Sequence, residues 1–325
     1  MTTTSSASQP LHVLLAAPRG FCAGVERAIE IVELALRAYG APVYVRHAIV
    51  HNTHVVADLE AKGAVFVEDE SEVPEGGLIV FSAHGVSPEV KAASARLGLR
   101  TIDATCPLVT KVHYEARDYA AQGYAIILVG HEGHQEVIGT TGNAPEAIHV
   151  VATPEEVDRL GLDNPERVAY ITQTTLSVDE ASSVIGAILR RFPHARGPRG
   201  DDICYATQNR QDATKELARL TDLVLVIGSQ TSSNSQRMVE VARDHGAPSH
   251  LIDDVTHLRE EWFDQVRAVG VTSGASAPDV LVDGVLEALR ARPGGALVEP
   301  LEVVDEQMHF ALPASLRRLP IASAS

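Results

Sequence analysis

The chain has 325 residues, which is more than one hydrophobic core usually supports, so two or three smaller lobes are expected. Its 43 Asp and Glu residues outnumber its 27 Lys and Arg residues, and the net charge of −16 argues against a general binder of nucleic acids or anionic membranes. The N-terminal segment MTTTSSASQP lacks the basic and apolar regions of a signal peptide, and the longest apolar runs, such as 124–129, are too short to cross a bilayer. We therefore expect a soluble cytoplasmic protein.

Short β-rich runs alternate with helical stretches along the chain. A strand is expected at 11–17, and a helix from about 24 to 39, where apolar residues recur with helical spacing. Further strands are expected at 43–46, 78–81, 124–129, 168–172, 223–227 and 268–272. This alternation predicts an α/β fold with mostly parallel sheets.

Polar turns follow most of these apolar runs. They read AAPRGFCAG (16–24), FSAHGVS (81–87), VGHEGH (129–134), ITQTTLS (171–177), IGSQTSSNS (227–235) and VTSGASAP (271–278). Ligands of open parallel sheets gather at the carboxyl ends of the strands. Six polar strand ends therefore predict several sheets that face one cleft.

The three cysteines, Cys22, Cys106 and Cys204, are too few and too scattered for a secreted disulfide framework, which indicates a reducing compartment. They are spaced by about one small domain each. We therefore predict three small α/β domains, each delivering one thiolate to a shared centre. The domains are residues 22–106, 107–200 and 201–292, with the N-terminal strand 11–21 joined to the third, followed by a C-terminal tail at 293–325.

The local sequence around each cysteine favours metal or cluster binding. Cys22 follows a tight turn at Gly20 and stands at the mouth of the first expected helix, where the helix dipole favours a thiolate. Cys106 precedes a proline that suits the first turn of a helix, and Cys204 is expected at a strand-to-helix turn. The alternative is that all three are buried structural thiols.

The number of cysteines bears on the kind of metal site. Structural zinc normally takes four protein ligands, often from CxxC pairs, which this chain lacks. A Cys₃His zinc site that uses one of the fourteen histidines remains an alternative. A four-iron cluster held by three thiolates has one iron that can bind a substrate oxygen as a Lewis acid while the cluster supplies electrons. Three cysteines without a fourth therefore favour the cluster.

Eight ordered segments resemble one protein family. They are PRGFCAGV (18–25), YVRHAIVHN (44–52), FSAHGVS (81–87), DATCPLVTKVH (103–113), TQTTLSVD (172–179), DDICYAT (201–207), SSNS (232–235) and GASAPD (274–279). From Leu11 to about Pro300 the chain resembles the 4-hydroxy-3-methylbut-2-enyl diphosphate reductase family, also called the LytB family. The resemblance implies three α/β domains around a pseudo-threefold axis with an iron–sulfur cluster at the centre. The segment GHEGHQE (130–136) departs from the family pattern, with Gln135 in place of proline.

The resemblance also implies an activity and a set of site residues. The activity is reductive dehydroxylation of 4-hydroxy-3-methylbut-2-enyl diphosphate to isopentenyl and dimethylallyl diphosphate, the final step of the non-mevalonate isoprenoid pathway, with ferredoxin or flavodoxin as electron donor. Each subunit would hold one [4Fe-4S] cluster with an open iron and three ligands, Cys22, Cys106 and Cys204. The diphosphate would be surrounded by His51, His84, His134, Ser232, Ser233, Asn234 and Ser276. Thr174 and Glu136 would lie at the reacting hydroxyl, with Glu136 as the proton donor, directly or through Thr174.

The residue types agree with these roles, although each has a second interpretation. Several hydroxyl, amide and imidazole donors suit a diphosphate, but residues 232–234 are also typical of a helix N-cap, and the two can coexist. His131 and His134 could be paired zinc ligands, but the glycines beside them make a helix unfavourable there. Glu136 could be an exposed charge, whereas burial beside a diphosphate and a reduced cluster would raise its pKa and keep it protonated.

Two other classes of function fit a three-cysteine cluster. A cluster-dependent hydro-lyase would act on a small anionic substrate with the open iron as a Lewis acid and without net electron transfer. Dependence of turnover on a reductant separates it from a reductase. An iron or redox sensor would need no shell of diphosphate-binding side chains.

Overall fold

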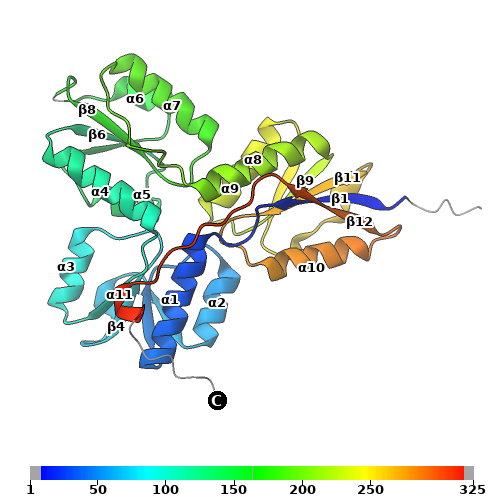
Figure 1. Ribbon diagram of the computed structural model, residues 1–325, viewed down its shortest axis with the longest axis horizontal. Coiled ribbons are helices and arrows are strands. Elements are labelled where there is room, and N and C mark those ends of the chain that lie inside the picture. The colour runs from blue at the N-terminus through cyan, green and yellow to red at the C-terminus, as the bar shows by residue number, and fades with distance from the viewer. Residues whose placement is uncertain (1–8, 163, 318–325) are drawn as a thin grey trace, which may run out of the picture. The chain divides into compact units, whose positions relative to one another are not determined.

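A computed structural model describes residues 9–162 and 164–317, which form α-helices and parallel β-strands (Figure 1). Contacts divide the chain into two compact units. The first comprises the chain up to Cys22 together with Tyr205–Gln307, and the second comprises Ala23–Cys204 together with the chain from Met308. Among the described residues, no helix is long and apolar enough to span a membrane.

The first unit is built on one parallel sheet with the strand order β10-β9-β11-β1-β12. Its strands are β1 (Leu11–Ala17), β9 (Leu223–Ile227), β10 (Ser249–Ile252), β11 (Ala268–Ser273) and β12 (Ala296–Glu302). Its helices are α8 (Tyr205–Leu220), α9 (Ser233–Asp244) and α10 (Asp279–Arg290), with the short 3₁₀ helices η2 (Val255–His257) and η3 (Glu260–Phe263).

Alternate residues of the inner strand β9 face opposite sides of this sheet. Leu223, Leu225 and Ile227 pack with the apolar face of α10. Val224 and Val226 pack with the apolar faces of α8 and α9. Figure 1 shows α10 on one side of the sheet and α8 and α9 on the other. Because both faces are covered, the strand is apolar along its whole length, as is usual for parallel sheets.

The second unit contains two smaller parallel sheets. One has the order β3-β2-β4-β5 and the other has the order β7-β6-β8. Their strands are β2 (Val43–Arg46), β3 (Ala64–Val67), β4 (Leu78–Phe81), β5 (Arg100–Asp103), β6 (Ala125–Val129), β7 (Ile148–Val151) and β8 (Val168–Thr172). The helices are α1 (Ala23–Tyr39), α2 (Thr53–Ala61), α3 (Pro88–Arg96), α4 (Pro107–Ala121), α5 (Gln135–Thr141), α6 (Pro154–Arg159), α7 (Val178–Arg191) and α11 (Ala314–Arg317), with the 3₁₀ helix η1 (Glu70–Glu72).

The three sheets share one topology. Each sheet contains three consecutive strands of which the second in chain order is at the edge, the first is next to it, and the third follows: β3-β2-β4, β7-β6-β8 and β10-β9-β11. A fourth strand then pairs with the third, namely β5 beside β4 and the N-terminal β1 beside β11. Beside β8 the fourth place holds a single bridge between Ala169 and Arg196. The α/β fold with parallel sheets is thus confirmed, and the start of the chain completes the last sheet.

The strands whose bounds the sequence predicted are all present, within one residue of those bounds. The strands that were not expected are β3, β5, β7, β10 and β12, and each lies at the edge of its sheet. Edge strands are partly exposed, and β5 (RTID) and β12 (ALVEPLE) carry polar residues, whereas β3 (AVFV) is short and wholly apolar.

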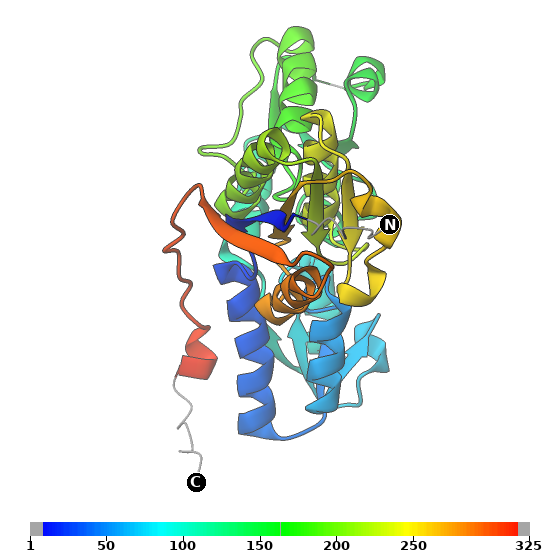
Figure 2. The ribbon, with the colours of Figure 1, turned by 90° about the vertical axis from the view of Figure 1, so that its right-hand side faces the viewer.

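The segment assigned to a C-terminal tail contains two further elements. Residues 296–302 form β12, which pairs with the whole length of β1 (Figure 2). The short helix α11 lies beside α1 within the second unit. Residues 318–325 of the expected tail lie outside the described residues. The domain boundaries at 106/107 and 200/201 stay predictions.

Candidate functional site

Each cysteine directly precedes a helix. Cys22 comes before α1, Cys106 is the N-cap of α4, and Cys204 comes before α8. All three side chains are half-buried. Pro107 occupies the first turn of α4, as expected from the sequence, because its missing N–H is not needed there. The helix dipole at such positions favours the thiolate form of cysteine.

The backbone of each cysteine is anchored to the end of the third strand of a sheet. The N–H of Cys22 donates to the carbonyl of Ala275 at 3.2 Å, just beyond β11. The N–H of Cys106 donates to the carbonyl of Ala83 at 3.0 Å, just beyond β4. The N–H of Cys204 donates to the carbonyl of Thr174 at 3.1 Å, just beyond β8. Each accepting residue stands two positions after its strand, so the arrangement is the same three times.

The expected strand before Cys204 is absent among the described residues. The chain between α7 and α8 pairs with β8 only at the bridge of Arg196. The sequence that follows, GPRGDD (197–202), contains proline and two glycines, which are unfavourable in a strand. Cys204 therefore lies at a loop-to-helix junction, which corrects the expected strand-to-helix turn.

No three His, Cys, Asp or Glu side chains within 9–162 and 164–317 are grouped as they would be around one metal ion. His131 and His134 also do not act as a pair. His134 caps α5, whereas His131 lies 3.3 Å from Glu180 through its Nε2 atom. Ligands of a four-iron cluster bind different irons and stand further apart than ligands of one ion. The result for single-ion sites therefore does not bear on cluster binding by the three cysteines.

Three histidine rings lie together at the carboxyl ends of strands in the second unit. The ring centroids of His51 and His84 are 4.2 Å apart, and the ring of His134 lies 5.6 Å and 6.1 Å from those of His51 and His84. Each ring follows a strand that ends nearby, namely β2, β4 and β6. The structure therefore brings together the three histidines that the sequence singled out.

Burial disfavours the protonated form of these histidines. It lowers the pKa of His134 to about 4, lowers that of His84 well below its usual value, and lowers that of His51. Neighbouring imidazoles add to the effect, because a second positive charge is unfavourable beside a first. The Nδ1 atom of His134 accepts the N–H of Glu136 at 3.2 Å, so the ring proton is on Nε2. A neutral His134 can thus still donate one hydrogen bond to an anion.

Glu136 is buried, with 2% of its surface exposed, in the first turn of α5. Its Oε1 accepts the backbone N–H of Thr174 at 2.7 Å, and its Oε2 lies 2.8 Å from the Oγ1 of Thr174. Burial raises the pKa of Glu136 to about 7, although the two bonds from Thr174 oppose the shift. Because the carbonyl of Thr174 accepts the N–H of Cys204, one short path joins the acid to a cysteine.

Gln135 occupies the first position of α5. A proline is well accommodated at this position, because the backbone there is helical and the N–H has no partner within the helix. The departure from the family pattern is therefore compatible with the same backbone around Glu136.

The serines and the asparagine lie in the first unit, at the ends of β9 and β11. Ser232 is the N-cap of α9, Ser233 is the first residue of that helix, and Ser276 follows β11. Asn234 is 4% exposed, and its Oδ1 atom has no hydrogen-bond partner. An unpaired buried amide oxygen is unfavourable, so this residue fits a polar ligand better than a purely structural role.

The N-cap and the phosphate interpretations coexist at α9. Ser232 accepts the N–H of Ser235 at 3.4 Å, which is the expected capping bond. The Ser235 hydroxyl also donates to the Ser232 Oγ at 3.1 Å and therefore orients it. Ser235 fills the space between the ends of β9 and β11, where a Cβ on Gly228 or Gly274 would come within 2.3 Å or 2.0 Å of its hydroxyl.

Asp202 is a buried residue that the sequence reasoning did not single out. Its carboxylate accepts the N–H of Thr172 at 2.9 Å and a bond from Lys111 at 2.7 Å. Burial raises the pKa of Asp202 to about 7. No spacing rule connects Lys111 with Asp202, so only its place two residues before Cys204 could have indicated a role.

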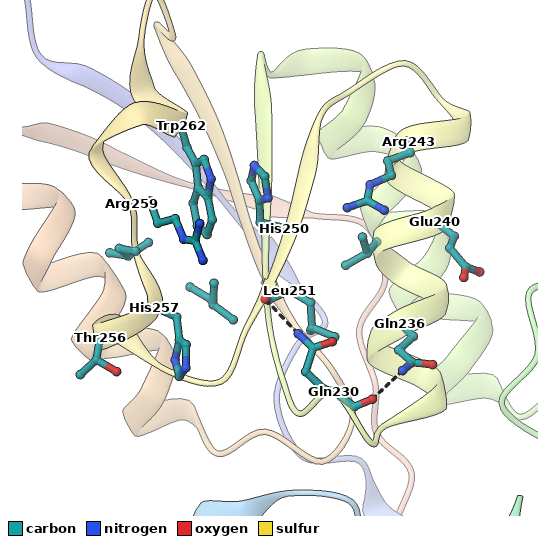
Figure 3. A pocket seen from close by; sticks show the side chains of 13 residues that line it. Gln230, Gln236, Glu240, Arg243, His250, Leu251, Thr256, His257, Arg259 and Trp262 are labelled. Atoms are coloured by element: carbon teal, nitrogen blue, oxygen red, sulfur yellow. Dashed lines mark hydrogen bonds between the residues drawn. The ribbon is translucent and has the colours of Figure 1, made fainter.

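A hollow of about 690 Å³ in the first unit is lined by none of these residues (Figure 3). It lies between α9 and the edge strand β10. The ring of His250 stacks on that of Trp262 at 3.8 Å there, and Gln230 donates to the Leu251 carbonyl at the edge of β10. The hollow is therefore distinct from the strand ends that carry the predicted site.

Comparisons with known proteins agree with the geometry. The family model of the LytB protein matches residues 13–290. The 4-hydroxy-3-methylbut-2-enyl diphosphate reductase of Acidothermus cellulolyticus is 58% identical over 94% of this chain and 90% of its own length. The reductase of the same name from Ralstonia nicotianae is 51% identical over 97% of this chain and 99% of its own length.

Two solved structures are also similar. The E-1-hydroxy-2-methyl-but-2-enyl-4-diphosphate reductase of Plasmodium falciparum has a TM-score of 0.92 and 37% identity, covering 95% of this chain and 97% of its own. A structure of (E)-4-hydroxy-3-methyl-but-2-enyl diphosphate reductase, the terminal enzyme of the non-mevalonate pathway, has a TM-score of 0.62 and 33% identity, covering 86% of this chain and 98% of its own.

Proposed function

The chain belongs to the LytB protein family, and from this premise we propose that it converts 4-hydroxy-3-methylbut-2-enyl diphosphate to isopentenyl and dimethylallyl diphosphate. This is a reductive dehydroxylation and the final step of the non-mevalonate pathway. The observation that carries the proposal is the buried Glu136, whose pKa is about 7 and whose partner Thr174 is bonded to the backbone of Cys204. A proton donor in this position is what departure of the hydroxyl as water requires.

We propose that Cys22, Cys106 and Cys204 hold one [4Fe-4S] cluster per subunit. The donor set fits, because each cysteine directly precedes a helix whose dipole favours the thiolate. Held by these three cysteines, such a cluster would supply electrons and Lewis-acid chemistry to the reaction. Thiolates are also the ligands that iron–sulfur clusters prefer.

The side chains proposed to contact the diphosphate are those that the family resemblance implies, and they are described for each unit by itself. His51, His84 and His134 contribute imidazole N–H donors, and a bound anion raises their pKa values toward protonation. On the first unit the proposed contacts are Ser232, Ser233, Asn234 and Ser276, of which three lie at the N-terminus of α9. A helix N-terminus attracts anions through its exposed N–H groups and its dipole.

The two bonds between Glu136 and Thr174 define a path for the proton. The backbone N–H of Thr174 can only donate, so Oε1 of Glu136 is an acceptor in either protonation state. The acidic proton therefore resides on Oε2, which faces the Thr174 hydroxyl at 2.8 Å. In the protonated enzyme Oε2 donates to Thr174 Oγ1, and that hydroxyl donates its own proton onward to the leaving group.

The electron donor is proposed to be ferredoxin or flavodoxin, because the reaction consumes electrons and no hydride carrier is part of the proposal. The cytoplasm is the proposed location. The full chain, reconstituted with iron and sulfide without oxygen, should convert the substrate only when a reductant is present. Isopentenyl and dimethylallyl diphosphate should appear together by mass spectrometry. Turnover without reductant would instead identify a hydro-lyase and refute the proposal.

A further inference from the structure

Three cations contact the backbone just ahead of the three cysteines. Arg27 lies on α1, the helix that follows Cys22. Its Nη1 donates to the carbonyls of Ala104 and Thr105 at 3.2 and 3.1 Å, directly before Cys106. Its Nε donates at 2.9 Å to the carbonyl of Ala311. Arg27 is 9% exposed, so these bonds are made in a largely dry setting.

Lys111 makes the corresponding contacts one helix later. It lies on α4, the helix that follows Cys106. Its Nζ donates to the carbonyls of Gly200 and Asp201 at 2.7 and 3.1 Å. It also donates at 2.7 Å to the carboxylate of Asp202, which is itself bonded to the end of β8. The loop before Cys204 thus accepts three hydrogen bonds from Lys111 on α4.

Arg210 completes the series. It lies on α8, the helix that follows Cys204, and its side chain is fully buried. Its Nη2 donates to the carbonyls of Gly20 and Arg19 at 2.8 and 3.4 Å, ahead of Cys22. Its Nη1 lies 2.9 Å from a carboxylate oxygen of Glu306, which balances the buried charge.

We propose that Arg27, Lys111 and Arg210, the loop-binding cations, are positioning residues for the three cysteine ligands; this rests on the proposed function. The helix after each cysteine carries the cation that holds the loop of another cysteine, and every one of these bonds lies within one of the two units. Carbonyl oxygens bound to a cation cannot turn toward water, so each loop keeps one conformation.

The same cations could instead only stabilise the fold, and the experiment must separate these roles. Each helix also carries an exposed arginine away from the cysteine loops, namely Arg37 on α1, Arg117 on α4 and Arg219 on α8. These three provide matched control variants with the same change in charge. Replacement by methionine keeps most of the apolar stem, and exchange of lysine and arginine keeps the charge.

Hydrogen exchange of the full chain before cluster loading gives the first readout. In Lys111→Met the amides of residues 199–204 should exchange about 10- to 100-fold faster, the factor that loss of hydrogen bonds to a charged donor implies. Amides of the core strand β6 should be unchanged. Lys111→Arg should restore most of the protection, and Arg117→Met should have no effect on this loop. Equal protection in Lys111→Met and Arg117→Met would overturn the proposal.

Cluster retention gives the second readout. After anaerobic reconstitution, Arg27→Met, Lys111→Met and Arg210→Met should lose iron to a chelator faster, in line with the roughly 10- to 100-fold loss of metal affinity seen when supporting residues are removed. The three control variants should match the unmodified chain. If a methionine variant fails to fold, the glutamine variant at the same position takes its place with the same expected loss; retention equal to that of the control variants in all of the variants that fold would overturn the inference. A wild-type chain that takes up no cluster would refute the proposed function, while the exchange data would still test the loop contacts.

Discussion

Replacement of Glu136 by glutamine should stabilise the second unit at alkaline pH while it removes the proton donor. Burial raises the pKa of this carboxyl from 4.5 to about 7, so the folded state binds the proton more tightly than the unfolded state. The contribution of this carboxyl to the free energy of unfolding is therefore fully present below about pH 4.5. It is lost as the pH rises from there through about 7. At about 1.36 kcal/mol for each pKa unit, the loss is about 3 kcal/mol at pH 8.

Glutamine keeps both contacts of the carboxylate. Its Oε1 accepts the N–H of Thr174, and its Nε2 can donate to the Thr174 hydroxyl. At pH 8 the free energy of unfolding of the variant should therefore exceed that of the unmodified chain by about 3 kcal/mol, so the variant should unfold at higher denaturant. At pH 5 the two proteins should have nearly the same stability.

The assay is urea unfolding of the full chain before cluster loading, between pH 5 and pH 8. The chain has one tryptophan, Trp262, which lies in the first unit, so its fluorescence reports that unit alone. Circular dichroism reports both units, and the difference between the two signals isolates the second unit, which contains Glu136. A Glu136→Gln variant whose stability has the same pH dependence as the unmodified chain would refute the assignment of a buried carboxyl with a raised pKa.

The remaining predictions concern the reaction and its ligands. The Glu136→Gln variant should keep its cluster colour and bind substrate, yet lose about 10²- to 10⁴-fold in turnover, measured by product formation under reductant. In the unmodified enzyme kcat should fall as the pH rises above about 7, because the acid is then ionised, and a flat profile would point to another proton donor. Cys204→Ser should abolish stable cluster binding, seen as loss of iron and of visible absorption, because a hydroxyl poorly replaces a soft thiolate. Asn234→Ala and His84→Ala should each weaken substrate binding by about 1.5–3 kcal/mol with an unchanged cluster spectrum; unchanged affinity in both would place the diphosphate elsewhere.

The sequence alone determined the central strands and the residues that follow them. Strands such as β4 and β9 are apolar throughout because both of their faces are covered, and this pattern is visible in a single sequence. The motifs with Cys22, His84 and Glu136 could be read in the same way, because each lies at or shortly after a strand end. Local chemistry and a specific family resemblance were sufficient for these features.

The tertiary structure alone decided which distant residues meet. Edge strands such as β5 and β12 have partly exposed, partly polar sequences, so their pairing depends on neighbours far away in the chain. The pKa of Glu136 is set by burial and by Thr174, 38 residues away, rather than by its own flanking sequence. Likewise the contact of Arg27 with the loop before Cys106 joins segments 77 residues apart. A sequence shows which groups are available, but burial and contact between distant segments arise only when the chain is packed.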